Sequence, residues 1–105
     1  MTEAPKPSAN MFADKPLAGQ HALVTGGSRG IGATVSEYLA RMGASISLTA
    51  RNADTLDAHA KTLRDAHGAE VFTSAGDMSK EDNIVVAFEG AVDAFGPVDI
   101  LVANA

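Results

Sequence analysis

A cluster of glycines after the first apolar run of the chain has the composition of a phosphate-binding turn. The run at residues 21–25 leads into the sequence TGGSRGIG, residues 25–32, where a helical pattern begins. Glycines let the backbone approach an anion closely, and the first amides of a helix, at the positive end of its dipole, point toward that anion. The spacing is G-x-x-x-G-x-G, whereas the general dinucleotide fingerprint is G-x-G-x-x-G. The segment predicts a phosphate site in which Gly32→Val would block the pyrophosphate path and, if the backbone angles at Gly32 permit a side chain, would leave the chain folded; a tight turn without a ligand is the alternative.

Two arginines near this turn indicate which nucleotide would bind. Folds that prefer NAD usually place Asp or Glu about 20 residues after the glycines, where the acid would repel a ribose 2′-phosphate. Ala50 stands at that place, Arg51 follows it, and Arg29 lies within the turn. Because guanidinium groups form charge-assisted hydrogen bonds with phosphate, the pattern favours NADP(H), with solvated arginines as the alternative. Ser28 and Asn52 could add neutral hydrogen bonds or serve only as turn and cap residues.

The other reactive side chains match no metal or nucleophile site. His21, His59 and His67 have no spacing that would hold a metal, so solvated or capping roles are expected for them. The sequence has no cysteine, which excludes disulfides, thiolate metal sites and a cysteine nucleophile. No Gly-Lys-Ser/Thr follows the glycines, which argues against a P-loop nucleotidase. We therefore expect no metal site.

The expected phosphate site needs a scaffold that brings several loops to one edge of a sheet. The chain has the alternation of strands and helices that builds such a scaffold. Short apolar and β-branched runs at 21–25, 44–50, 69–75 and 98–103 alternate with three stretches of helical spacing. This β-α-β-α-β-α-β order predicts an α/β fold of the Rossmann type with a doubly wound parallel sheet. Right-handed crossovers and a reversal of winding after the third strand predict the strand order 3-2-1-4.

Each helical stretch is expected to bury one apolar stripe and to end at a glycine. The predicted stripes are Ile31, Val35, Leu39 and Met42; Leu56, Ala60 and Leu63; and Ile84, Phe88, Val92 and Phe95. The predicted stops are Gly43, Gly68 and Gly96, the last followed by Pro97. Ser79 and Asp82 have the spacing of a capping box, in which the two residues would satisfy each other's backbone donors at the start of the third helix.

The segment TGGSRGIG directly after Ala-Leu-Val resembles the cofactor loop of the short-chain dehydrogenase/reductase family, and two more strand ends agree. That family characteristically ends its third strand in an aspartate that contacts adenine; Asp77 stands there, with an Asx turn as its alternative role. The fourth strand of the family ends in Asn-Asn-Ala-Gly, where this chain has Ala103, Asn104 and Ala105. Ala103 replaces the first asparagine, so the hydrogen bond of that side chain must be absent or supplied otherwise. The resemblance covers roughly residues 17–105 and implies an NADP-dependent enzyme.

The resemblance also implies a catalytic group of a serine, a Tyr-x-x-x-Lys pair and an asparagine, in which the tyrosine is the general acid or base. Tyr38 is followed four residues later by Met42, so it fails this pattern and is expected to pack in the core or on the helix surface. No catalytic residue is assigned within the chain. The catalytic residues are expected beyond Ala105, and the 105-residue chain is expected to be inactive alone.

Composition and charge fit a globular domain that binds small molecules. The sequence is 46% hydrophobic and 20% charged, and its formal net charge of −5 disfavours nucleic acid and anionic lipid as partners. No apolar run approaches the ~20 residues of a membrane-spanning helix, and no secretory signal is visible, so a cytoplasmic location is expected. Residues 1–16 hold three of the four prolines and are expected to form a flexible tail. Residues 17–105 are expected to form a partial NADP(H)-binding domain, truncated after the fourth strand.

Together, the patterns favour an oxidoreductase that transfers a hydride between NADP(H) and a carbonyl or alcohol substrate. By resemblance, 3-oxoacyl thioester reductases and ketone reductases share this style of loop, and the full-length protein would be a homo-oligomer, a tetramer or a dimer. Alternatives are a non-catalytic NADP(H)-binding or sensing module and, less favoured, a methyltransferase. Substrate and reaction direction stay open. The expected cofactor contacts are Gly26, Ser28, Arg29, Gly30, Ile31, Gly32, Arg51, Asn52, Asp77, Met78 and Asn104.

Overall fold

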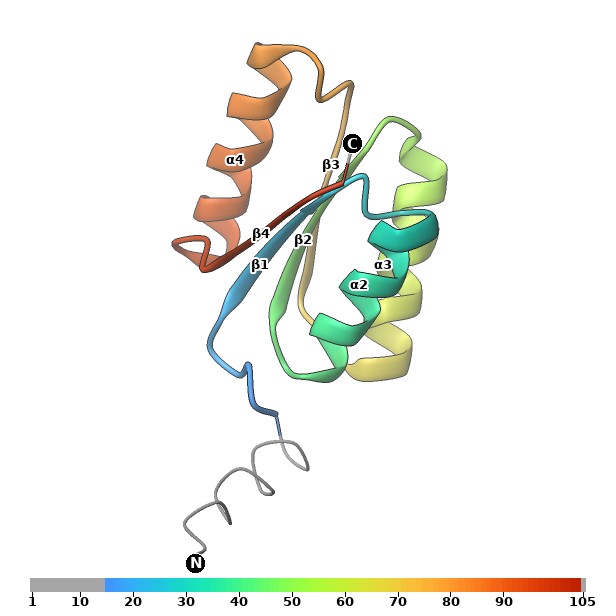
Figure 1. Ribbon diagram of the computed structural model, residues 1–105, viewed down its shortest axis with the longest axis vertical. Helices are drawn as coiled ribbons and strands as arrows, with labels where there is room; N and C mark the ends of the chain where they lie inside the picture. The colour runs from blue at the N-terminus through green and yellow to red at the C-terminus, as the bar shows by residue number, and fades with distance from the viewer. Residues whose placement is uncertain (1–14, 105) are drawn as a thin grey trace, which may run out of the picture.

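The apolar runs of the sequence pair as one parallel sheet in the computed structural model, which describes residues 15–104 (Figure 1). The order β3-β2-β1-β4 and the parallel pairing confirm the predicted Rossmann-type topology. The elements are β1 His21–Thr25, α2 Gly30–Arg41, β2 Ser45–Ala50, α3 Ala53–His67, β3 Val71–Ala75, α4 Glu81–Phe95 and β4 Ile100–Ala103.

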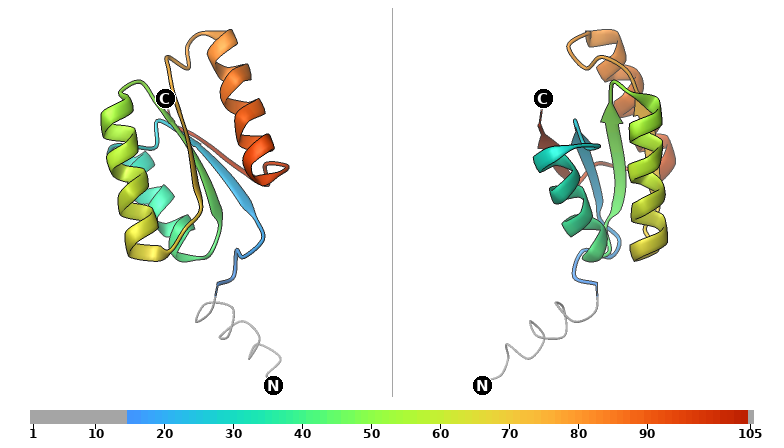
Figure 2. Two further views of the ribbon diagram at one scale, coloured as in Figure 1. Left: turned by 180° about the vertical axis from the view of Figure 1, so that it is seen from behind. Right: turned by 90° about the vertical axis from the view of Figure 1, so that its right-hand side faces the viewer.

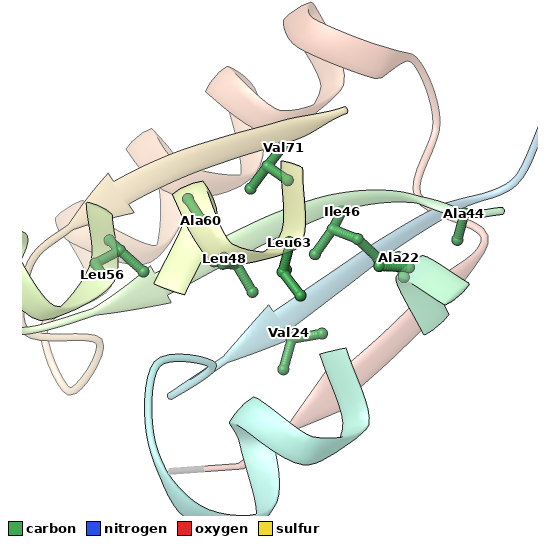
Figure 3. Packing of buried hydrophobic residues seen from close by; sticks show 10 residues of the cluster. Ala22, Val24, Ala44, Ile46, Leu48, Leu56, Ala60, Leu63 and Val71 are labelled. Atoms are coloured by element: carbon green, nitrogen blue, oxygen red, sulfur yellow. The ribbon is translucent and has the colours of Figure 1, made fainter. Parts of the chain in front are cut away.

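The sheet separates two helical layers. Helices α2 and α3 cover one face of it, and α4 lies against the other (Figures 1 and 2). Because side chains alternate along a strand, every second residue of β1 and β2 points toward α2 and α3. This arrangement forms the main apolar core (Figure 3), whose buried members are Ala22, Val24, Ala40, Ala44, Ile46, Leu48, Leu56, Ala60, Leu63 and Val71.

The predicted inward stripe is right for α3 and only partly right for α2, where Leu39 packs against the core. Helix α3 buries Leu56, Ala60 and Leu63, as expected. Helix α2 instead buries Gly32, Ser36 and Ala40, whereas Ile31, at the start of the predicted stripe, is 73% exposed. Small residues on the buried face allow the axis of α2 to lie close to the sheet and to α3.

The same displacement of the buried face occurs in α4. Its buried residues are Ala87 and Ala91, whereas Ile84 and Phe88 of the predicted stripe are about half exposed. A Cβ atom on Gly90 would lie 2.6 Å from Cζ of Phe72 in β3, which shows how closely this helix approaches the sheet. The predicted apolar stripe of α4 is therefore only partly right. The Phe95 ring packs edge-on against His21, whereas the small residues Ala87 and Ala91 take the closest positions against the sheet.

The predicted helix ends are observed, and the predicted capping box is not. Helix α2 ends at Arg41, and Gly43, with a φ angle of 100°, follows its C-cap residue Met42. Gly68 and Gly96 cap α3 and α4 at their carboxyl ends, with positive φ angles of 65° and 85°. Helix α4 begins at Glu81, and no side chain caps its first turn. The predicted box fails because the amide and hydroxyl of Ser79 both donate to the Oδ1 atom of Asp77.

His21 lies in the interior, contrary to the solvated or capping role expected for it. Its ring nitrogens are 2.6 Å from the Ser47 hydroxyl and 3.0 Å from the Gly96 carbonyl oxygen, and its backbone N–H donates to Asp99 at 2.9 Å. Partners on three segments satisfy the polar atoms, so burial leaves no hydrogen bond unmade. The network joins the start of β1 to the connection between α4 and β4.

The segment before β1 is described only in part. The tail expected at residues 1–16 lies outside the described residues except for Lys15 and Pro16, and its flexibility stays a prediction. Leu17 packs against the core, and its backbone N–H donates to the carbonyl oxygen of Met42 at 2.7 Å. Between residues 15 and 104, no helix combines the length and the apolar character needed to cross a membrane.

Candidate functional site

The loops that carry the candidate residues meet at the carboxyl edge of the sheet (Figure 1). Thr25, the last residue of β1, is in register with Thr49 of β2 and with Ala103 of β4. The backbone N–H of Gly76 donates to the carbonyl oxygen of Ala50 at 2.8 Å, which holds the end of β3 beside the end of β2. Parallel strands therefore place the connections after β1, β2 and β3 and the end of β4 at one edge, where ligands bind in open α/β sheets.

A cleft of about 600 Å³ opens at this edge. Its walls include side chains of α4 and of the sheet, among them Leu23, Ala87 and Phe88. Sequence reasoning did not assign these apolar residues to the site, because only the packing of α4 brings them to it. The volume is in the range of small-molecule sites. The expected contact residues that line the cleft are Gly26, Arg51, Asp77, Met78 and Asn104.

The glycine turn is packed against the end of β4. The Nδ2 atom of Asn104 donates to the carbonyl oxygen of Gly26 at 3.3 Å, and its backbone N–H donates to Oγ1 of Thr25 at 3.0 Å. A Cβ atom on Gly26 would collide with the carbonyl oxygen of Asn104. These contacts join β1 to β4 where Ala103 stands in place of the asparagine of the resembled family.

Gly32 is required by the turn itself. A Cβ atom there would collide with the carbonyl oxygen of Gly26 and would lie 2.7 Å from Nδ2 of Asn104. The expectation that Gly32→Val leaves the chain folded is therefore wrong, since the side chain would meet backbone before it met any ligand. Gly30 differs, because it has a φ angle of 58° and a Cβ atom there would meet no other atom within 4 Å. The open side of the turn therefore faces outward at Gly30.

The start of α2 offers hydrogen-bond donors to an anion. Its N-cap residue, Arg29, is extended and exposed and makes no side-chain cap bond, and the first turn contains no acidic residue. The other two helices differ, because α3 has Asp54 in its first turn and α4 has Glu81 and Asp82. An uncapped helix start beside a turn of glycines fits a phosphate group.

Ser28 and Asn52 flank the two arginines, and the structure shows a local role for Asn52. The Asn52 side chain accepts a hydrogen bond from the backbone N–H of Thr55 at 2.9 Å and so caps α3. Ser28 is partly exposed. The cap anchors the helix that begins directly after Arg51 and Asn52, while any contact of Asn52 with a ligand stays a prediction.

Arg51 and Asp77 form an ion pair across the mouth of the cleft. Nη2 of Arg51 lies 3.2 Å from Oδ2 of Asp77, and the arginine side chain is 77% exposed. The other carboxylate oxygen accepts hydrogen bonds from the hydroxyl and the amide of Ser79, at 2.7 and 2.9 Å. These bonds, with the smaller effect of Arg51, lower the pKa of Asp77 to about 2. Asp77 is therefore ionised at neutral pH. The presence of Ser79 two residues after Asp77 is the sequence pattern that indicates this Asx turn.

Other chemistry is not visible in the part of the chain that the structure describes. Residues 15–104 bring together no group of three or more histidine and acidic side chains that would hold a metal. Tyr38 is 53% exposed on α2, and the Arg41 guanidinium lies 5.4 Å from the centre of its ring. The tyrosine thus packs on the helix surface, away from the cleft.

Comparisons with known proteins agree with this geometry. The family model described as short chain dehydrogenase matches residues 20–105. Gluconate 5-dehydrogenase of Gluconobacter oxydans is 42% identical over 89 residues, which are 85% of this chain and 34% of the relative. A 3-oxoacyl-[acyl-carrier-protein] reductase of Chlamydia trachomatis is 33% identical over 85% of this chain and is covered to 36%. The chain thus spans about a third of the length of these relatives.

Solved structures share the fold of this chain. L-sorbose reductase from Gluconobacter frateurii, complexed with NADPH and L-sorbose, has a TM-score of 0.84 and 37% identity, with 88% of this chain and 35% of that chain covered. A metagenomic short-chain oxidoreductase in complex with NADP has a TM-score of 0.78 and 43% identity, with coverages of 85% and 40%. Both were crystallised with a nicotinamide dinucleotide that carries a 2′-phosphate.

Proposed function

Since the chain belongs to the short-chain dehydrogenase family, we propose that it is the NADP(H)-binding part of an oxidoreductase that acts on a carbonyl or alcohol. The observation that carries the proposal is the convergence of Gly26, at the start of the glycine turn, with Arg51 and Asp77 on one cleft at the carboxyl edge of the sheet. The relatives crystallised with NADPH or NADP support the choice of cofactor.

In this proposal the start of α2 and the residues of the cleft beside it divide the cofactor between them. The first amides of α2, beside the open face of Gly30, bind the pyrophosphate, and the adenine lies near Asp77 and Met78. Arg51 binds the 2′-phosphate, and Arg29 adds a second positive charge from the start of α2. When bound, NADP(H) supplies or accepts the hydride, while these residues hold and orient it.

The choice of NADP(H) over NAD(H) rests on charge at the end of β2. Ala50 offers no carboxylate to the ribose 2′-hydroxyl, and Arg51 beside it is exposed at the cleft. A 2′-phosphate bound at the end of β2 would be attracted by the Arg51 guanidinium and would meet no carboxylate from β2 itself.

Hydride transfer to a substrate is proposed for the whole protein and not for this chain alone. Residues 1–105 contain no Tyr-x-x-x-Lys pair, so we expect cofactor binding by this chain without reduction of a ketone. A cytoplasmic location and a homo-oligomeric whole protein stay predictions.

The decisive experiment compares NADPH and NADH binding in the double variant Ala50→Asp/Arg51→Ala. A charge-assisted hydrogen bond contributes about 1.5 to 3 kcal/mol, so the loss of Arg51 and the added repulsion should weaken NADPH binding at least about tenfold. NADH, which lacks the phosphate, should change little. Titrations followed by cofactor fluorescence would measure both dissociation constants.

Arg41→Ala is the matched control, because Arg41 is an exposed arginine at the opposite end of α2. This variant should bind NADPH and NADH as the wild-type chain does. Equal weakening of both cofactors in the double variant would contradict the assignment of Arg51. A wild-type chain that binds neither cofactor would contradict the proposed function as a whole.

A further inference from the structure

The ion pair between Arg51 and Asp77 links the residue expected at the 2′-phosphate with the residue expected at the adenine. We propose that Asp77 limits the preference for NADP(H) by holding the Arg51 guanidinium and competing with the 2′-phosphate for it. The inference rests on the proposed function, because it concerns how the same site recognises NADP(H). Competition for Arg51 is a role separate from the adenine contact that is expected for Asp77.

The competing carboxylate is fixed in place before any ligand arrives. One oxygen of Asp77 receives both the hydroxyl and the amide of Ser79, which orients the carboxyl group on the chain. The second oxygen is thereby directed to the nearest Nη atom of Arg51, 3.2 Å away. The side chain of Asp77 is 31% exposed and that of Arg51 is 77% exposed, so water screens the pair and its effect on binding should be small.

Arg51, in contrast, is the movable partner. Its side chain is 77% exposed, and within residues 15–104 it forms an ion pair with Asp77. A phosphate bound to Arg51 must either displace the carboxylate or share the guanidinium with it. In both cases the negative charge of Asp77 opposes the dianion, which lowers the affinity for a ligand with a 2′-phosphate and leaves one without it unaffected.

Two small probes isolate this effect: 2′,5′-ADP, which carries a 2′-phosphate and a 5′-phosphate, and 5′-AMP, which lacks only the 2′-phosphate. The measured quantity is the ratio of their dissociation constants, 5′-AMP over 2′,5′-ADP, by isothermal titration calorimetry on the chain. Asp77→Asn removes the charge and retains the shape and the acceptor oxygen. Because an exposed ion pair is weak, the ratio should rise by about two- to fivefold.

The ratio separates specificity from adenine binding. Any contact of residue 77 with adenine is common to both probes and cancels. Asp77→Ala, which also removes the charge, should raise the ratio in the same direction even though both affinities fall. Far-ultraviolet circular dichroism would verify that each variant is folded. The two variants then measure the effect of the Asp77 charge independently of each other.

The Arg51→Ala background shows whether the arginine transmits the effect. There Asp77→Asn should change the ratio clearly less than in the wild-type chain, because no guanidinium remains to compete for. An equal rise in that background, or an unchanged or lower ratio for the single variants, would overturn the inference alone. A wild-type chain that does not distinguish the two probes would overturn the proposed role of Arg51 as well.

Discussion

At the scale of single residues, the turn after β1 has no space for a side chain at two of its glycines. Gly26 and Gly32 each leave no room for a methyl group, and both contacts involve the segment at Asn104 or the turn backbone. Asn104 is 78 positions from Gly26 along the chain, yet its amide donates to the carbonyl oxygen of Gly26. The shape of the candidate phosphate site therefore depends on the end of β4.

Gly32→Ala should destabilise the chain. A methyl group there must push the turn away from Asn104, and overpacking of this kind costs about 1 to 3 kcal/mol. The melting temperature should fall by about 4–8 °C for each kcal/mol, measured by circular dichroism. Gly30→Asn is the control, since asparagine tolerates a left-handed backbone and the site is open; its melting temperature should stay close to that of the wild-type chain.

At the scale of elements, a polar contact joins α2 to α3 where periodicity alone would place apolar residues. The fully buried Ser36 hydroxyl donates to the Ala33 carbonyl oxygen at 2.9 Å and lies 2.8 Å from Nε2 of His59. Burial lowers the pKa of His59, and the nearby charge of Glu37 partly opposes that shift. The solvated role expected for His59 is thus replaced by a position between two helices.

This lowered pKa predicts a pH-dependent stability. Below pH 6.5 the unfolded chain takes up a proton at His59 that the folded chain resists, so the free energy of unfolding should decrease as the pH falls through 6.5. The decrease should end once the pH is below the pKa of the folded state. Urea unfolding over a pH series that spans this value would measure the slope.

His59→Gln should reduce the slope just below pH 6.5, because the titrating group is gone. His67→Gln is the matched control on the same helix, where His67 lies 3.3 Å from Glu37. A slope that survives in His59→Gln and disappears in His67→Gln would contradict the assignment to the contact with Ser36.

At the scale of the whole molecule, the core is one-sided. Buried apolar residues concentrate between the sheet and the layer of α2 and α3 (Figure 3). On the side of α4, and at the sheet edge formed by β4, large apolar side chains are about half exposed or more. They are Ile84, Val85, Val86, Phe88 and Leu101.

We expect the 105-residue chain to be marginally stable and to self-associate. Exposed apolar side chains next to an edge strand favour contact between copies. Sedimentation velocity should show species larger than a monomer, increasing with concentration. Leu101→Lys, which places a charge on the edge strand, should shift the distribution toward the monomer, whereas Tyr38→Lys on the opposite layer should not. A stable wild-type monomer that also oxidises NADPH with a ketone would contradict both this expectation and the expected absence of catalysis.

The sequence by itself determined the order of the elements, the topology and the position of the turn. Glycine stops and the alternation of short apolar runs with helical stretches are local signals, and the handedness of crossovers leaves few ways to arrange four parallel strands. The buried face of α3 was also predictable, because polar residues occupy most of its other positions and Leu56, Ala60 and Leu63 form an apolar stripe. Several of the expected contact residues line the cleft for the same reason, since each follows a strand or lies in the turn after β1.

Only the tertiary structure decided which faces of α2 and α4 are buried and how the charges of the site are paired. Apolar residues lie on more than one side of these two helices, so periodicity could not choose between a bulky stripe and the small residues that allow close packing. The pair of Arg51 with Asp77 and the burial of His21 depend on strands that are neighbours in space and distant in sequence. Such contacts leave no local pattern, because each is set by the register of the sheet and the packing of helices upon it.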